Sequence, residues 1–175
     1  GAKLDAEVAK RFFFYAVPGL GTWFLARNAR RLGAEGVVRQ ILTTCCVDIN
    51  RIPAEVYAAH VALFDRRLRE HPHTHHSFIG AARSVLRILA GRRRFYAEVD
   101  RIRAPTLIVH GAQDRLVHVA SSRALVDRRP DFRLAEFEDV GHVPQLEDPE
   151  RFVDTVAPWL DGLALDRQDA PATSI

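Results

Sequence analysis

The chain has 175 residues, of which 47% are hydrophobic and 27% are charged, a composition typical of one soluble globular domain. Its formal net charge of +3 is modest, and its arginines fall in short groups without interleaved aromatic residues, so we expect solvated helix faces and no nucleic-acid partner. Its two cysteines, Cys45 and Cys46, are sequence neighbours, which argues against a disulfide framework and favours a cytoplasmic location.

The longest apolar run in the sequence, FFFYAVPGLGTWFLA, covers residues 12–26. It is shorter than the roughly 20 residues that a membrane span requires, and one proline and two glycines interrupt it, so no membrane span is predicted. We predict two short helices with a bend. An alternative is an apolar wall over a substrate pocket, to which these side chains would contribute: Phe12, Phe13, Trp23 and Phe24.

The first part of the chain, residues 1–99, has a helical pattern and no strand signal. Apolar side chains recur at helical spacing over residues 35–46, 53–70 and 77–91. In the last of these segments, Ser77 is the expected N-cap and Gly91 the expected C-cap. We therefore expect residues 1–99 to form an all-helical region.

The pattern changes after residue 100, where strands and helices alternate. The continuous apolar run TLIVH follows a proline and ends at a glycine, which is typical of a strand buried on both faces of a parallel sheet. After it we predict a helix over 121–130, a strand over 132–141 and a helix over 148–160. This order forms a right-handed parallel unit. The tail, residues 163–175, lacks periodicity and is expected to be disordered.

Two polar residues follow the predicted strands, at the edge of a parallel sheet where ligands collect. Asp114 comes after the first strand, in HGAQDRLV, and His142 comes after the second, in DVGHVP. Neighbouring parallel strands lie about 4.8 Å apart, so the loops at their ends can bring the two side chains together. An acid that orients an imidazole, and an imidazole that accepts a proton, are two members of a nucleophile–base–acid triad.

The two motifs, PTLIVHGAQDRLV and FEDVGHVPQLEDPERF, resemble the C-terminal end of the α/β-hydrolase family. In that family a Gly-x-x-Asp at a strand end bears the catalytic acid, and a later Gly-His bears the base ahead of a Glu-x-Pro-x-x-Phe helix. The matching positions are Gly111, Asp114, Gly141, His142, Glu147, Pro149 and Phe152. The resemblance implies a helical cap over 1–99, followed by the C-terminal βαβα part of the hydrolase core over 100–162.

The family's nucleophile motif, Gly-x-Ser-x-Gly, is absent from this sequence. The resemblance therefore implies a cap plus the last two strands of an α/β-hydrolase fold, without the upstream strands of the sheet. Two parallel strands leave an unpaired edge beside residues 107–109, where we expect either a missing N-terminal half or a second copy of the chain. Without a nucleophile, the chain alone is predicted to be inactive.

The activity that the resemblance implies is hydrolysis of an ester-type small molecule with an apolar body, by a nucleophile–His142–Asp114 triad without a cofactor. Val143 would join the aromatic residues named above in contacting the substrate. With an aspartate nucleophile, the same family hydrolyses epoxides or haloalkanes. The alternative from another class is a non-catalytic truncated fragment, or a binding module that needs a complementary chain.

A histidine-rich segment, HPHTHH, places His71, His73, His75 and His76 within six residues. Four imidazoles could bind zinc, but the segment contains a proline and no carboxylate or thiolate ligand. We therefore predict a solvated cap loop or a polar lining of the cap entrance, and no metal site.

Overall fold

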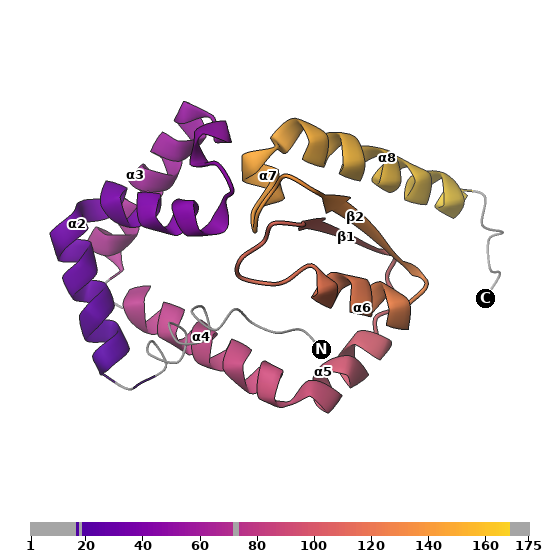
Figure 1. Ribbon diagram of the computed structural model, residues 1–175, viewed down its shortest axis with the longest axis horizontal. Coiled ribbons are helices and arrows are strands. Elements are labelled where there is room, and N and C mark those ends of the chain that lie inside the picture. The colour runs from indigo at the N-terminus through magenta and orange to yellow at the C-terminus, as the bar shows by residue number, and fades with distance from the viewer. Residues whose placement is uncertain (1–16, 18, 72–73, 169–175) are drawn as a thin grey trace.

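The computed structural model describes residues 17, 19–71 and 74–168. The helical part of the chain contains α2 (Leu20–Cys45), the short 3-10 helix η1 (Ile49–Arg51), α3 (Ala54–Glu70), α4 (Thr74–Ala90) and α5 (Arg92–Asp100). No strand lies among the described residues of this part, as the sequence pattern predicts. Figure 1 shows α2 and α3 side by side, with α4 and α5 running from them toward the sheet.

Two helices of this part differ from the predicted ones. Helix α2 runs from Leu20 to Cys45 and so includes residues 20–26. It changes direction at Gly33, whose φ of 67° and ψ of 179° are non-helical. Of the two short helices with a bend predicted over residues 12–26, residues 20–26 form the start of α2, directly after Gly19, whose φ is 79°, and residues 12–16 and 18 lie outside the described residues. Helix α4 begins at Thr74, so Ser77 lies inside the helix and is not its N-cap.

The C-terminal part contains β1 (Thr106–Gly111), α6 (Ala120–Arg128), β2 (Phe132–Phe137), α7 (Pro144–Glu147) and α8 (Pro149–Gln168). The two strands are parallel and pair in register from Thr106 with Phe132 to Gly111 with Phe137. Helix α6 makes the crossover between them and packs on β2, while α7 and α8 contact β1 (Figure 1). The predicted strand–helix–strand–helix order is confirmed.

Three details of this part differ from the prediction. Strand β2 ends at Phe137, so the following residues to Val143 form a loop that carries the Gly-His motif. Residues 106–110 of β1 are half-buried instead of buried on both faces, because β1 has a paired strand on one edge only. Helix α8 continues to Gln168, so residues 163–168 are helical where disorder was expected. A single glycine is tolerated within a helix, and the segment after Gly162 is rich in helix-forming residues.

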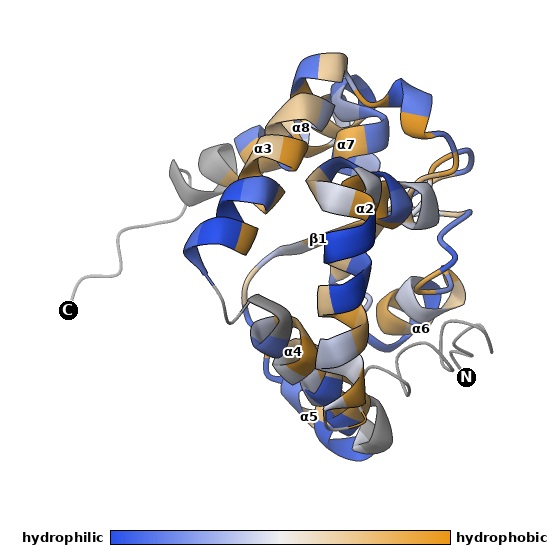
Figure 2. Ribbon diagram, turned by 90° about the vertical axis from the view of Figure 1, so that its left-hand side faces the viewer, coloured by the Kyte–Doolittle hydropathy of each residue, from blue (hydrophilic) through white to orange (hydrophobic). Residues whose placement is uncertain are grey.

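The helical part meets the C-terminal part at the loop after β2. A buried cluster of Val38, Leu42, Cys46 and Ile52 packs against residues of α3 and against Val143 and Leu146. Figure 2 shows hydrophobic residues interleaved with hydrophilic ones along α2, α3 and α4, the pattern of helices that bury one face. None of the described helices is long and apolar enough to cross a membrane. The contact between the two parts places the end of α2 beside the candidate site.

Candidate active site

Asp114 sits in a tight turn directly after β1. Its backbone N–H donates to Gly111 O, and its carboxylate Oδ1 accepts hydrogen bonds from the backbone N–H groups of Leu116 at 2.7 Å and Val117 at 2.9 Å. An aspartate that accepts from the backbone two residues further on is a common turn-forming arrangement. The side chain is only 4% exposed, so the turn holds a buried carboxylate at the carboxyl end of the strand.

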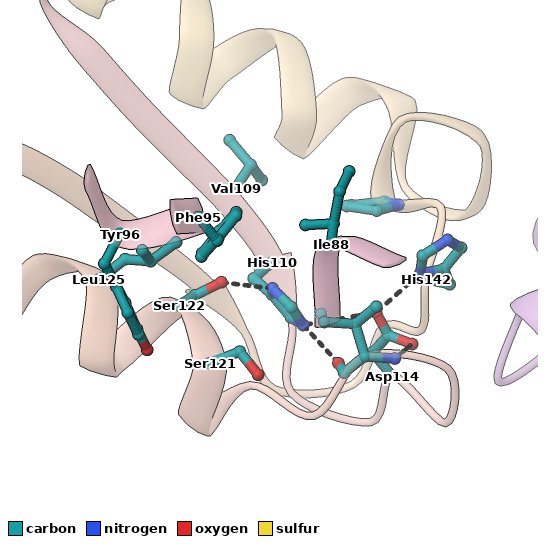
Figure 3. A pocket seen from close by; sticks show the side chains of 13 residues that line it. Ile88, Phe95, Tyr96, Val109, His110, Asp114, Ser121, Ser122, Leu125 and His142 are labelled. Carbon is teal, nitrogen blue, oxygen red and sulfur yellow. Dashed lines mark hydrogen bonds and ion pairs between the residues drawn. The ribbon is translucent and has the colours of Figure 1, made fainter. Parts of the chain in front are cut away.

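His142 lies at the end of the loop after β2, opposite Asp114. Its Nδ1 donates to Asp114 Oδ2 at 2.8 Å, and its side chain is 38% exposed (Figure 3). Its backbone N–H donates to Cys45 O, at the end of α2, at 2.7 Å. The structure therefore brings together the two residues that the sequence places at neighbouring strand ends. With Nδ1 engaged by the acid, Nε2 is the ring nitrogen that can accept a proton.

Two glycines allow the backbone segments of the site to approach each other closely. A Cβ atom on Gly111 would lie 2.1 Å from Gly141 O, and one on Gly141 would lie 2.3 Å from Cys45 O. Neither position can carry a side chain without moving backbone. The glycines of both sequence motifs are therefore explained by packing of three backbone segments around the acid and the base.

Glu147 fastens the His142 loop to the end of α2. The residue is 2% exposed, and its Oε1 accepts from the N–H groups of Val47 and Asp48, both at 2.8 Å. Its Oε2 accepts from Gly141 N–H at 2.8 Å. Three charge-assisted hydrogen bonds compensate for the burial of the carboxylate. Glu147 thus supports the residue next to the imidazole and lies away from the pocket.

The surroundings of Asp114 favour its ionised form. Burial alone would raise the pKa of the Asp114 carboxyl, but hydrogen bonds from His110, His142 and the backbone at Val117 and Leu116 together hold the pKa well below its ordinary value. Asp114 is therefore a carboxylate at any pH near neutrality, as an acid that orients and stabilises a protonated imidazole must be.

His110 is a site residue that sequence reasoning missed. It lies in β1, and the apolar run around it predicts a core histidine with a backbone partner. The ring does contact the backbone, with Nε2 2.9 Å from Val117 O, but Nε2 also lies 3.4 Å from Asp114 Oδ2 and Nδ1 lies 2.7 Å from Ser122 Oγ. The contact with Asp114 raises the pKa of His110, against burial, which lowers it. Its place at the carboxyl end of the strand is the signal that could have found it.

A pocket of about 480 Å³ opens beside this group. Its polar side is formed by His110, Asp114, Ser121, Ser122 and His142, and its other walls come mainly from α4, α5, β1 and α6 (Figure 3). The larger apolar residues in these walls are Ile88, Phe95, Tyr96, Val109, Val117 and Leu125. The site therefore combines a His–Asp pair with an apolar cavity.

Three of the residues predicted to contact substrate do not line this pocket. Trp23 is 55% exposed on α2, Phe24 is also exposed there, and Val143 packs against the cluster at the end of α2. Phe12 and Phe13 lie outside the described residues. None of these three residues lines the pocket beside His142, whose helical walls come from α4, α5 and α6.

The histidine-rich segment forms no metal site that the structure describes. Among the described residues, no group of three or more His, Cys, Asp or Glu is arranged to hold a metal ion. His73 lies outside them, and His71 precedes α4, which contains His75 and His76. His60, on α3, is partly buried, with Nδ1 2.8 Å from Val56 O.

Comparison with known proteins gives related hydrolases. The family model described as serine aminopeptidase, S33, matches residues 49–149. The pimeloyl-[acyl-carrier protein] methyl ester esterase of Aromatoleum aromaticum is 46% identical over 54 residues, which cover 31% of this chain and 22% of that protein.

Two solved structures share the fold. One, from Acinetobacter baumannii AYE, is described as a candidate lipase, with a TM-score of 0.53, 20% identity and coverage of 81% of this chain and 46% of that one. The other, from Burkholderia cenocepacia, is described as a candidate aryl esterase, with a TM-score of 0.51, 20% identity and coverage of 94% and 50%. The chain spans about half the length of these two structures.

The family model covers more than half of the chain and includes Asp114, His142 and Glu147. The two solved structures share the fold over 81% and 94% of this chain. The predicted fold class is therefore confirmed, and the chain belongs to the α/β-hydrolases of the serine aminopeptidase (S33) family.

Proposed function

We propose that this chain supplies the acid and the base of an α/β-hydrolase that cleaves ester-type substrates with an apolar portion. The observation that carries the proposal is the hydrogen bond of 2.8 Å between buried Asp114 and half-exposed His142, at the same end of two parallel strands. A turn former and a loop histidine without a shared role would not need this alignment. The esterase relative from Aromatoleum aromaticum supports the substrate class.

The proton chemistry follows from the two ring nitrogens of His142. Asp114 accepts from Nδ1–H and so fixes the tautomer in which Nε2 is unprotonated. Nε2 then takes the proton of an attacking hydroxyl group and later donates it to the leaving alcohol. The sequence has no Gly-x-Ser-x-Gly, so the hydroxyl belongs to a serine in residues beyond these 175, or to another chain.

The cavity beside His142 supports an apolar portion in the substrate. Its walls are built largely from aliphatic and aromatic side chains of α4, α5, β1 and α6, and Asp114 and His142 form a polar end (Figure 3). An ester carbonyl at the polar end and a hydrocarbon part against Phe95 and Leu125 would match this division.

The test is hydrolysis of short-chain p-nitrophenyl esters by two proteins. The 175-residue chain alone should give no rate above the buffer blank, because His142 and Asp114 have no nucleophile to serve. The chain extended by the in-frame residues encoded upstream of Gly1 should hydrolyse the esters if those residues carry a Gly-x-Ser-x-Gly.

In the extended protein, His142→Ala and Asp114→Asn should each lower kcat by about 10³-fold or more, as removal of a triad member does. The exposed histidine variant His118→Gln serves as a control for loss of an imidazole and should stay within a few-fold of the parent. Full activity after His142→Ala would overturn the proposal. Turnover by the 175-residue chain that a serine-directed phosphonate abolishes would place the nucleophile within it.

A further inference from the structure

The side chain of His110 is held at both ends by groups from different elements. Nδ1 lies 2.7 Å from Ser122 Oγ on α6, and Nε2 lies 2.9 Å from Val117 O in the loop that follows Asp114. The ring is 10% exposed and stands between the crossover helix and the acid (Figure 3). Its orientation is therefore fixed by contacts that do not involve His142.

These contacts also determine which nitrogen carries the proton in the neutral ring. A backbone carbonyl only accepts hydrogen bonds, so the nitrogen facing Val117 O is Nε2–H. Nδ1 then accepts from the hydroxyl of Ser122. The Nε2–H edge of the ring also faces Asp114 Oδ2, 3.4 Å away, which is the same oxygen that accepts from His142.

The carboxylate of Asp114 is thus restrained through both oxygens. Oδ1 accepts from the N–H groups of Leu116 and Val117, and Oδ2 lies between the two imidazoles. Without His110, the loop around Val117 loses a side-chain donor and Oδ2 loses its second neighbour. Oδ2 would then be free to turn toward solvent, and its distance to His142 Nδ1 would no longer be set.

Ser122 is an anchor for the ring and is not placed as a second nucleophile. Its own N–H and that of Arg123 both donate to Val119 O, so the first turn of α6 offers neither N–H to a developing oxyanion. The residue is also buried, at 5% exposed. The hydroxyl is therefore a fixed partner for His110 Nδ1.

We infer that His110 is a positioning residue, which holds the Asp114 carboxylate in the orientation that binds His142, with Ser122 fixing the His110 ring. The inference rests on the proposed function in that it assigns His110 to the same acid and base. It goes beyond that function because it adds a third side chain to the site. From its sequence alone, His110 is expected to be a core residue of β1.

Two other titratable groups, Glu136 and Cys45, lie near His110 and Asp114. Glu136 on β2 pairs in register with His110, and its carboxylate is engaged by Arg123 at 2.6 Å. From α2, the Cys45 thiol has its pKa raised by burial and by the charge of Asp114, so the thiol stays neutral.

The test is NMR of protein labelled with ¹⁵N in its histidines, which reports the protonated nitrogen of each ring and the exchange of its proton with water. In the parent, His142 should be protonated at Nδ1 and His110 at Nε2. In His110→Phe, the Nδ1–H tautomer of His142 should no longer be preferred over the Nε2–H tautomer. The Nδ1 proton should exchange with water about tenfold faster, a change that corresponds to the free energy of about one hydrogen bond to a charged group. His110→Gln retains an N–H donor and should restore part of the effect.

Two further variants make the outcome decisive. Ser122→Ala keeps the His110 ring but removes its anchor, so the same change should appear in weaker form, even if His110→Phe fails to fold. His60→Gln removes a histidine whose Nδ1 contacts Val56 O within α3 and should leave His142 unchanged.

The inference is overturned if every folded variant at positions 110 and 122 keeps the parent His142 tautomer and exchange rate. The measurement needs no substrate, so absence of ester hydrolysis would count against the proposed function and leave this inference standing.

Discussion

Asp114 is the residue on which the contacts of the site converge. Two backbone N–H groups and two imidazoles surround its carboxylate, and they come from β1, from the acid loop itself and from the loop after β2. Because most of these contacts are with one side chain, the ionisation of that side chain is coupled to folding. The free energy of unfolding should therefore depend on pH through Asp114.

The folded pKa of Asp114 lies below its unfolded value of about 3.9, so these contacts stabilise the fold above that pH, and the stabilisation is lost as the pH falls through the folded pKa. The pKa of His110 is raised above about 6.5, so its stabilisation is present below that pH and is lost as the pH rises through the folded pKa. The difference in unfolding free energy between the parent and Asp114→Asn should be largest between about pH 4 and 6.5.

Urea denaturation over a series of pH values measures this difference. Asp161→Asn removes an exposed carboxylate from α8 and is the matched control, for which the difference should not vary with pH in this way. A flat difference for Asp114→Asn as well would mean that the two imidazoles do not stabilise the carboxylate.

Glu147 gives a second prediction at this scale. In Glu147→Gln, one carboxylate oxygen is replaced by an NH₂ group, which faces a backbone N–H donor and cannot accept from it. A buried N–H without its acceptor should lower the free energy of unfolding by about 1–3 kcal/mol. Glu138→Gln, at an exposed position, should change it by less than about 0.5 kcal/mol. Equal stabilities of the two variants in urea denaturation would contradict the fastening role of Glu147.

Among the elements, α2 determines how the helical part reaches the site, because its last residues contact the His142 loop. The direction of its C-terminal half is set at Gly33, whose φ of 67° and ψ of 179° belong to a region that essentially only glycine occupies. No atom would lie within 4 Å of a Cβ placed there, so backbone strain alone opposes a side chain. The kink is therefore a property of one residue.

Replacement by alanine should consequently change the stability of the protein in opposite directions at two helical glycines, Gly33 and Gly80. Gly33→Ala should lower the melting temperature, by the equivalent of about 1–3 kcal/mol of strain. Gly80→Ala, inside α4 with open space around its Cβ, should raise stability by about 0.5–1 kcal/mol through helix propensity. Circular dichroism melts compare the two variants, and stabilisation by Gly33→Ala would show that the kink is not required.

For the whole molecule, the dominant feature is a two-stranded sheet whose outer edges have no partner strand among the described residues. Large apolar side chains on neighbouring helices are exposed as well, including Phe78, Val85, Ile88, Phe95, Val153 and Leu160. Two-stranded sheets are marginal in water, and unpaired edges invite association. We expect either self-association of the chain or a complementary segment at this edge.

The 175-residue chain should therefore scatter light as more than a monomer, or bind a hydrophobic dye and melt over a broad range. Addition of residues that pair beside β1 should sharpen the transition and suppress dye binding. A monomer with a cooperative melt and no dye binding would show that the half-buried strands need no cover, and a binding module would become the better interpretation.

The sequence predicts the Asp114–His142 pair because its causes are local, namely a turn after each strand and a glycine at each close approach. It does not predict the role of His110, because an apolar strand pattern gives no sign of which side chains face the neighbouring loop. The pocket wall at Phe95 and Tyr96 is missed for a related reason. Those residues follow three arginines in the sequence, and only the tertiary structure places them in the pocket wall.

The bonds that Glu147 accepts from Val47 and Asp48 close a chain segment of 100 and 99 residues. Closing a loop of that length carries an entropic cost that only the completed contacts can offset, so we expect these bonds to form late in folding. During synthesis, α2 and α3 emerge well before Glu147 does. The contacts that hold the His142 loop can therefore be completed only when the last helices are available. We therefore expect the imidazole to acquire its orientation as one of the final events of folding, so that an incompletely folded chain does not present an ordered base to solvent.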